Sequence, residues 1–277
     1  MKTQQLTIHT LEDVAAIQKA ADLLDKGGLV AFPTETVYGI GCKVEPSVIE
    51  RLNGLKDRQP EKHYTLHVGS HDQIETFMAS MNMQTKKLIR NGLPGPMTVV
   101  FDVNQQTLEK IERIYSKHMP DLLCSDKTLG IRYPANQIAS AILARAKSAI
   151  VAPSANPAGQ SPASTVQEVL GYFEGRIDCV VEIPDSGCDY KKSSTVVKVG
   201  KEGVHILREG AITAQQVNQW ATIQILFVCT GNTCRSPMAE LFCKKHFSNI
   251  LGCQVDELDS FGYIIGSAGV AAFEGSP

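Results

Sequence analysis

Short apolar runs alternate along most of the chain with segments whose apolar residues recur every three or four positions. The first pattern is typical of buried β-strands and the second of amphipathic helices. A helix is predicted from Thr10, a candidate N-cap, to Gly28, because the apolar residues between Val14 and Leu24 fall on one face. A second helix is predicted from Ser47.

Further helical patterns lie between several of the apolar runs, and the polar turn PTETVYGIG follows the first run. Strands interleaved with helices indicate an α/β or α+β domain built on one twisted, mostly buried sheet. The predicted strands are 29–32, 64–68, 97–101, 130–133, 149–152, 179–183, 194–199 and 204–207, and the further helices are 70–79, 137–147 and 164–173.

The pattern restarts near residue 220, after the short amphipathic segment TAQQVNQW. IQILFVCTGN predicts a strand that runs into a glycine-containing turn, and SPMAELFCKKHF predicts a helix. We therefore expect a first domain over residues 1–215, a linker over 216–222, and an incomplete second domain over 223–277.

Composition narrows the class of protein. Hydrophobic residues make up 43% and charged residues 20%, which is ordinary for a soluble globular protein. The net charge of −2 provides no overall basic field for nucleic acid, so any polyanion must meet a local cluster. We find no signal peptide, no membrane-spanning run and no CxxC pair among the eight cysteines, so we expect a cytoplasmic protein with reduced thiols.

Several strand ends carry polar side chains that suit phosphate or carboxylate ligands. PTETVYG (33–39) combines a rigid proline with two threonines and a glutamate. LKDRQPEKHYTLHV (55–68) is rich in cations, which suit a polyphosphate but also fit a solvated charged loop. His67 lies within an apolar strand and is equally compatible with a core histidine. GLPGPMT, APSANPAGQSP, SSTVV and ILREGAI repeat the theme of a polar group at a strand end.

In this order, the motifs resemble those of the YrdC-like threonylcarbamoyl-AMP synthase family over about residues 10–212. The resemblance implies an open twisted α/β sheet with flanking helices and a concave groove. It implies condensation of L-threonine, bicarbonate and ATP into threonylcarbamoyl-AMP, with release of pyrophosphate. Mg²⁺ is expected to bridge the phosphates. Partner transferase proteins would then pass the threonylcarbamoyl group to a tRNA adenosine.

The resemblance also implies roles for individual residues, and the reaction needs positioning and charge stabilisation more than a covalent nucleophile. No catalytic residue is certain in this domain. Three positions depart from the family pattern, namely Lys62, Asn136 and Lys198. The implied threonine-binding residues are Thr34, His67, Arg132, Ala152 and Ser194, and the implied ATP-binding residues are Lys56, Arg58, Lys62, Thr128, Ser154 and Arg208.

VCTGNTCRSPMAE (228–240) carries a different chemistry. Backbone N–H groups at a helix N-terminus, with Arg235, suit a phosphate dianion, and the same field favours a nucleophilic Cys229 thiolate. The segment resembles the start of a low-molecular-weight protein tyrosine phosphatase, with SAGVAAFEGSP (267–277) as its next strand and loop. That family's acid lies in an Asp-Pro pair, which this chain lacks. We expect no phosphatase activity and a poorly packed segment after Trp220, either part of a longer fusion or vestigial.

Two alternatives to the synthase stay open at this point. One is a YrdC-like module that binds double-stranded RNA or assists ribosome maturation without synthesising anything, and its RNA binding would depend on salt. The chain is alternatively part of a fused protein tyrosine phosphatase. We expect the small-molecule substrates, the downstream transferase proteins and at most weak RNA binding as partners, and no membrane.

Overall fold

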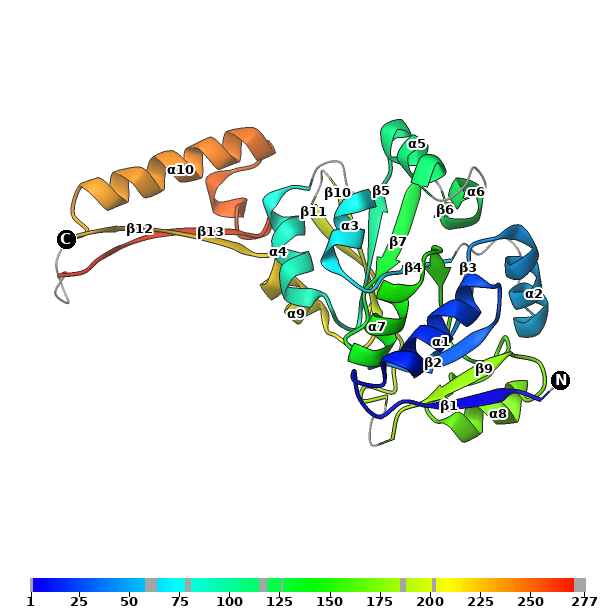
Figure 1. Ribbon diagram of the computed structural model, residues 1–277. Coiled ribbons are helices and arrows are strands. Elements are labelled where there is room, and N and C mark those ends of the chain that lie inside the picture. The colour runs from blue at the N-terminus through cyan, green and yellow to red at the C-terminus, as the bar shows by residue number, and fades with distance from the viewer. Residues whose placement is uncertain are drawn as a thin grey trace. The chain divides into compact units, whose positions relative to one another are not determined.

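The computed structural model describes residues 2–57, 64–77, 81–114, 119–125, 127–184, 188–200 and 203–271. Contacts divide the chain into two compact units (Figure 1). The first contains residues 1–81 and 92–214, and the second contains residues 82–91 and 215–277. The second unit is therefore discontinuous in sequence, because it takes in a helix from the middle of the chain.

The first unit is built on an eleven-stranded mixed sheet among the described residues. Its strand order is β1-β9-β2-β3-β8-β4-β7-β5-β10-β11, with β6 paired to β7. The pairs β4–β7 and β10–β5 are parallel, whereas β5–β7 is antiparallel. The strands are β1 (Gln4–Thr7), β2 (Val30–Pro33), β3 (Tyr38–Lys43), β4 (Leu66–His67), β5 (Met97–Asp102), β6 (Cys124–Ser125), β7 (Thr128–Arg132), β8 (Ile150–Val151), β9 (Cys179–Glu182), β10 (Thr195–Gly200) and β11 (Gly203–Arg208).

Helices flank this sheet, as Figure 1 shows. A hydrophobic core cluster joins α1 and α7 to β2 and β9, with Ile17, Phe32, Ile142 and Val181 each buried. The apolar stripes of the two helices thus bury one end of the sheet. The helices of this unit are α1 (Val14–Asp25), α2 (Pro46–Lys56), α3 (His71–Phe77), α5 (Gln105–Ile114), α6 (Met119–Leu123), α7 (Gln137–Arg145) and α8 (Val166–Phe173).

The expected α/β sheet with flanking helices is confirmed, and two local predictions are wrong. The first helix begins at Val14 rather than Thr10, because the Asp13 carboxylate accepts the backbone N–H groups of His9 and Thr10. Val14 itself is exposed. The stretch expected to be a polar turn contains strand β3, since Tyr38 begins a hairpin with β2 and only residues 34–37 turn.

The second unit has a small parallel sheet of two strands, β12 (Ile223–Cys229) and β13 (Tyr263–Gly269), among its described residues. α10 (Arg235–Leu251) packs on it. α9 (Ala214–Ala221), α4 (Met83–Gly92) and the 3-10 turn Val255–Glu257 complete the described elements of this unit. Three α4 side chains donate to carbonyl oxygens of the unit, including Asn91 to Trp220 at 3.2 Å.

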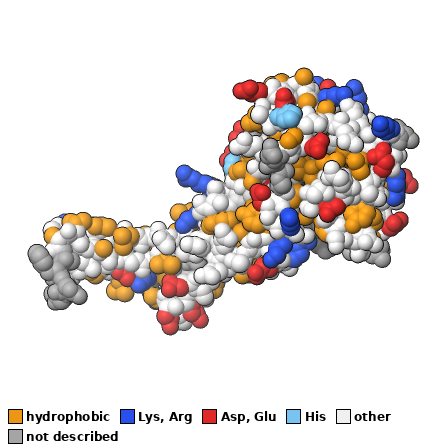
Figure 2. Space-filling view, turned by 90° about the horizontal axis from the view of Figure 1, so that it is seen from below, with side chains coloured by type: hydrophobic (Ala, Val, Ile, Leu, Met, Phe, Trp, Pro, Cys, Tyr) orange, Lys and Arg blue, Asp and Glu red, His pale blue; other side chains and the backbone are white. Residues whose placement is uncertain are grey.

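Parallel sheets are normally covered on both faces, whereas strand β12 of this one exposes Leu226 and Val228. Apolar side chains lie along the outside of the unit in Figure 2, and the most exposed of the described ones are Leu241, Phe242, Ile250 and Val270. Phe242 is 73% exposed. The expectation of a poorly packed segment after Trp220 is confirmed. None of the described helices in either unit has the length and apolar composition needed to cross a membrane.

Candidate functional site

Strand register brings three polar residues from distant motifs side by side. Arg132 at the end of β7 pairs with His67 on β4 and with Thr98 on β5. Residues that pair across neighbouring strands place their side chains on the same face of a sheet. Arg132, His67 and Thr98 therefore form one row, although they lie far apart in the sequence.

The turn between β2 and β3 meets this row through hydrogen bonds to Arg132. The Nη2 atom of Arg132 donates to Thr36 Oγ1 at 2.6 Å, to Glu35 Oε1 at 2.9 Å and to Thr34 Oγ1 at 3.1 Å. Thr34 in turn donates to the Val37 carbonyl at 2.7 Å, which closes the turn. The rigid PTET sequence thus supplies three oxygens to one nitrogen atom.

The Arg132–Glu35 ion pair is buried in the protein interior. The two side chains are 9% and 6% exposed. A charge at such depth costs several kcal/mol unless it is paired and hydrogen-bonded. The Nε atom of Arg132, by contrast, is buried and has no hydrogen-bond partner among the described residues. A buried donor without a partner indicates a position that a ligand oxygen would occupy.

His67 is held as a neutral imidazole. Burial, with the nearby Arg132 charge, lowers the pKa of His67 from 6.5 to about 3. Its Nδ1 atom lies 3.1 Å from the Thr65 carbonyl, which only accepts hydrogen bonds, so Nδ1 carries the proton. Nε2 is consequently an acceptor, and it is buried without a partner in the described part of the chain. A ligand O–H or N–H group would satisfy it.

Ser194, directly before β10, and Arg208, at the end of β11, lie beside this row. Ser194 Oγ lies 3.0 Å from Thr98 Oγ1, and both side chains are buried. Arg208 Nη2 donates to the Ser194 carbonyl at 2.8 Å. Burial, together with Arg132, lowers the pKa of Arg208. Two guanidinium groups therefore share this region with one carboxylate, that of Glu35.

The segment after β8 closes the site against β3. Ile40 donates its N–H to the Pro153 carbonyl at 2.8 Å, and Ala155 donates to the Tyr38 carbonyl at 2.7 Å. Gly39 permits this approach, since a Cβ atom there would come within 3.3 Å of the Ala152 Cβ and carbonyl oxygen. The backbone at Ala152 is fixed beside the hairpin turn in this way.

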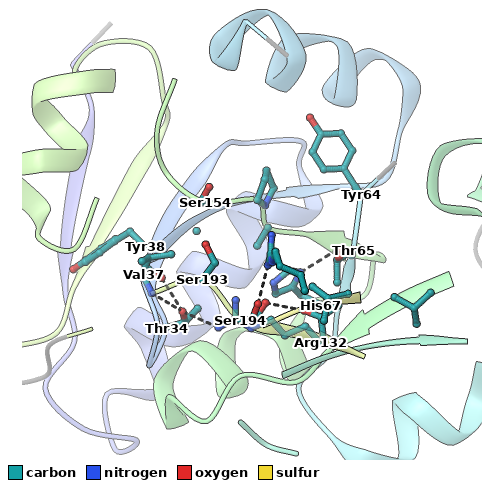
Figure 3. Close-up of a pocket in the computed structure, with 17 residues that line it drawn as sticks. Thr34, Val37, Tyr38, Tyr64, Thr65, His67, Arg132, Ser154, Ser193 and Ser194 are labelled. Carbon is teal, nitrogen blue, oxygen red and sulfur yellow. Dashed lines mark hydrogen bonds between the residues drawn. The ribbon is translucent and has the colours of Figure 1, made fainter. Parts of the chain in front are cut away.

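These elements enclose a cavity of about 260 Å³ (Figure 3). All five residues expected to bind threonine line it, as do two of those expected to bind ATP, Ser154 and Arg208. Thr98 and Ser193 also line the cavity, and the sequence analysis quoted their motifs without selecting them. Figure 3 shows Thr34, His67, Arg132 and Ser194 arranged around the same space.

The remaining expected ATP residues lie elsewhere. Lys56 is buried and does not line the cavity; its ammonium group donates to the carbonyl oxygens of Ser154 and, at 2.5 Å, of Asn156. Thr128 begins β7, four residues before Arg132, and is not among the cavity's lining residues. Arg58 and Lys62 lie outside the described residues.

Two of the three departures from the family pattern have structural partners. Asn136 is the N-cap of α7, and its side-chain oxygen accepts from the backbone N–H groups of Ile138 and Ala139. Lys198 pairs with Asp102 at 3.1 Å between neighbouring strands. Neither residue lines the cavity.

In the second unit, the Cys229 loop has the features expected of an anion-binding loop. Ser236 Oγ lies 2.9 Å from Cys229 Sγ, and the Asn232 backbone N–H donates to the sulfur at 3.2 Å. The Ser236 hydroxyl is the main reason that the pKa of Cys229 falls from 9.0 to about 7. Arg235 begins α10 and is exposed.

Comparisons with known proteins agree with both resemblances. Residues 22–210 match the model of the Sua5/YciO/YrdC family, described as telomere recombination. Residues 224–272 match the model of the low molecular weight phosphotyrosine protein phosphatase family.

A protein of Halorhodospira halophila named threonylcarbamoyl-AMP synthase is 30% identical over 69% of this chain and 94% of its own length. A protein of the same name from Pyrococcus abyssi is 27% identical over 73% of this chain, which spans 56% of that protein. The crystal structure of Pyrococcus abyssi Sua5 complexed with L-threonine has a TM-score of 0.66 at 18% identity, covering 97% of this chain and 92% of that one. That structural likeness supports the fold alone. The match over most of the chain shows that this protein belongs to the Sua5/YciO/YrdC family.

Proposed function

We propose that this chain is an L-threonylcarbamoyladenylate synthase, an enzyme that condenses L-threonine, bicarbonate and ATP into threonylcarbamoyl-AMP and pyrophosphate. The observation that carries the proposal is that one and the same cavity is lined by all five expected threonine-binding residues, Thr34, His67, Arg132, Ala152 and Ser194. The relatives named threonylcarbamoyl-AMP synthase support it. The Pyrococcus abyssi protein of similar fold was solved in complex with L-threonine.

Threonine would bind through two buried atoms that lack partners among the described residues, Arg132 Nε and His67 Nε2. Its carboxylate would accept from Arg132 Nε, and His67 Nε2 would accept an O–H or N–H of the amino acid. The Ser194 hydroxyl, which lies 3.0 Å from Thr98 Oγ1, would also donate to the carboxylate when Thr98 is the donor of that pair. The neutral state of His67 matters here, because an imidazolium would repel the threonine ammonium and offer no acceptor. One donor and one acceptor at fixed positions suit an amino acid better than a simple anion.

ATP would occupy the side of the cavity near Ser154 and Arg208. Lys56 would hold the Ser154 loop in place and contribute positive charge near the phosphates. The family motif alone supports the proposed ATP-binding roles of Thr128, Arg58 and Lys62. Figure 3 includes Ser154 on the same cavity as the threonine row.

Mg²⁺ is part of the proposal only as an ion carried by the nucleotide. Among the described residues, no group of three or more His, Cys, Asp or Glu side chains is arranged to hold a metal ion. A protein-held metal cage does not fit this site. Mg²⁺ usually binds substrate phosphates with few protein ligands, so ATP would bring the ion.

The reaction follows from these positions. The threonine amine attacks carbon dioxide derived from bicarbonate, forming a C–N bond and releasing one proton. A carbamate oxygen then attacks the α-phosphorus, and the bond from that phosphorus to the pyrophosphate oxygen breaks. Arg208 would stabilise the charge that develops on the phosphates, and Arg132 would hold the amino acid still, so rate enhancement comes from positioning and electrostatics.

The test is pyrophosphate release from ATP, measured with threonine and bicarbonate omitted in turn. Release that needs both co-substrates supports the synthase. Salt-dependent binding of double-stranded RNA without any threonine-dependent release would support the RNA-binding module instead. Transfer of the product to tRNA by partner proteins, and a cytoplasmic location consistent with eight free thiols, belong to the same proposal.

A further inference from the structure

Glu35 is one of the most deeply buried charged residues near the cavity, and the sequence analysis assigned it no role. It is 6% exposed. Its two carboxylate oxygens contact different segments of the chain. Oε1 accepts from Arg132 Nη2 at 2.9 Å, and Oε2 accepts from the Ala135 backbone N–H at 2.8 Å. Its own backbone is fixed as well, because the Glu35 carbonyl accepts from Tyr190 N–H at 3.1 Å.

Glu35 bridges Arg132 and Ala135, and the other contacts of Arg132 show the effect of this bridge on the guanidinium group. The two N–H bonds of Nη2 are shared among three oxygens, those of Thr36, Glu35 and Thr34. No N–H of Nη2 is then left for a ligand. The buried donor of this guanidinium that has no partner among the described residues is Nε–H. The plane of a guanidinium is rigid, so fixing Nη2 also fixes the direction of Nε–H.

A carboxylate suits this position better than a neutral acceptor. Arg132 and Arg208 both carry positive charge beside a half-enclosed cavity, and Glu35 is the carboxylate that pairs with one of them. Glu35 also joins the turn after β2 to the segment between β7 and α7. Loss of the bridge would free both the guanidinium and the turn that carries Thr34.

We propose that Glu35 is the positioning residue of the amino-acid site: by binding Arg132 Nη2 and Ala135 N–H together, it aims Arg132 Nε–H at the carboxylate of the amino acid. The inference rests on the proposed synthase function. It predicts that Glu35 acts on amino-acid binding without touching the substrate, and that ATP binding does not depend on it.

Two substitutions in the 277-residue chain change reach and charge in different ways. Glu35→Asp keeps the charge but loses about 1.5 Å of reach, so it no longer spans both partners. Glu35→Gln keeps the reach and the bond from Arg132, but it loses the charge and, because its amide nitrogen only donates, the bond from the Ala135 N–H. Glu45→Gln is the matched control, because Glu45 pairs with Lys43 on the surface and does not line the cavity.

Steady-state pyrophosphate release gives the first readout. We expect Glu35→Asp to raise the threonine KM about tenfold or more, because an error of about 1 Å in a binding group is costly. Glu35→Gln should raise it less, and the ATP KM should stay within about twofold in both. Glu45→Gln should change neither constant. Thermal unfolding of each variant identifies a general loss of structure.

The NMR signal of Arg132 Nε–H in the ligand-free protein gives a readout that needs no reaction. We expect its exchange with water to be slow in the wild type and about tenfold faster in Glu35→Asp. If the wild-type chain releases no pyrophosphate but this change occurs, the synthase proposal fails and the positioning of Arg132 by Glu35 stands.

Two outcomes would overturn the inference. One is a wild-type threonine KM in folded Glu35→Asp. The other is an equal rise in both KM values with a lowered melting temperature, which would make Glu35 merely structural. If neither Glu35 variant folds, Thr36→Val provides the test. This substitution removes the hydroxyl that accepts from Arg132 Nη2 at 2.6 Å. It should raise the threonine KM alone, and an unchanged KM would count against the proposal.

Discussion

Arg132→Lys is the most informative single perturbation of the proposed threonine site. An alanine at this position would leave the Glu35 carboxylate buried and unpaired, since the two side chains are 9% and 6% exposed. Breaking a buried pair in that way costs about 3–5 kcal/mol, a large part of a total stability of about 5–15 kcal/mol. Lysine keeps the positive charge for Glu35, so the fold should survive.

The size of the effect follows from the donors that lysine lacks. An ammonium group can retain the bond to Glu35, but it cannot also supply a fixed Nε–H to a ligand. A hydrogen bond to a charged group is worth about 1.5–3 kcal/mol. Since about 1.4 kcal/mol corresponds to a factor of ten, we expect threonine to bind roughly ten- to a hundredfold more weakly.

Calorimetric titration of threonine into the 277-residue chain measures this directly, and thermal unfolding checks the fold. Arg51→Lys is the matched control, because Arg51 pairs with Asp178 at 2.9 Å and does not line the cavity. Threonine affinity within about twofold of the wild type, in a folded Arg132→Lys protein, would refute the assignment.

Four further predictions concern other groups of the chain. Lys56→Met should raise the ATP KM about tenfold and the threonine KM less, because it removes the ammonium group that fixes the Ser154 loop. Stability should fall as the pH drops below 6.5, by about 1.4 kcal/mol per pH unit from His67, since the unfolded imidazole takes up a proton there and the folded one only near pH 3. Cys229 should react with iodoacetamide half-maximally near pH 7, and Ser236→Ala should move that midpoint upward. Hydrolysis of a phenyl phosphate ester should stay near background in the wild type and in Cys229→Ser, because no Asp-Pro acid is present.

Each of these predictions has a clear contrary outcome. Equal kinetics for Lys56→Met and the surface control Lys43→Met would remove Lys56 from the ATP site. Urea unfolding whose pH dependence is unchanged in His67→Gln, relative to the exposed His205→Gln, would contradict the neutral buried imidazole. A robust phosphatase rate that disappears in Cys229→Ser would show that the C-terminal segment is catalytically competent.

The sequence by itself determined the type of most elements and the chemistry at their ends. The apolar run 97–101 became β5 and the amphipathic stretch 137–147 became α7, because both patterns depend on neighbours within a few residues. The cavity residues were found through motifs, yet no pattern in those motifs says that His67 and Arg132 pair in one register. The local signal also failed at Asp13, where contacts within four residues move the start of the helix, and at strand β3, which pairs with β2 and β8.

Only the tertiary structure decided which polar groups are partners. Strand order places His67, Arg132 and Thr98 in one row, and the hairpin turn brings Glu35 to Arg132 across 97 positions of sequence. It also commits the Lys56 ammonium to backbone carbonyls. The physical reason is that periodicity and propensity act between near neighbours, whereas sheet register and burial are fixed by the packing of the whole unit. A sequence names the groups that a site can use; the fold decides which of them are already occupied and which remain for a ligand.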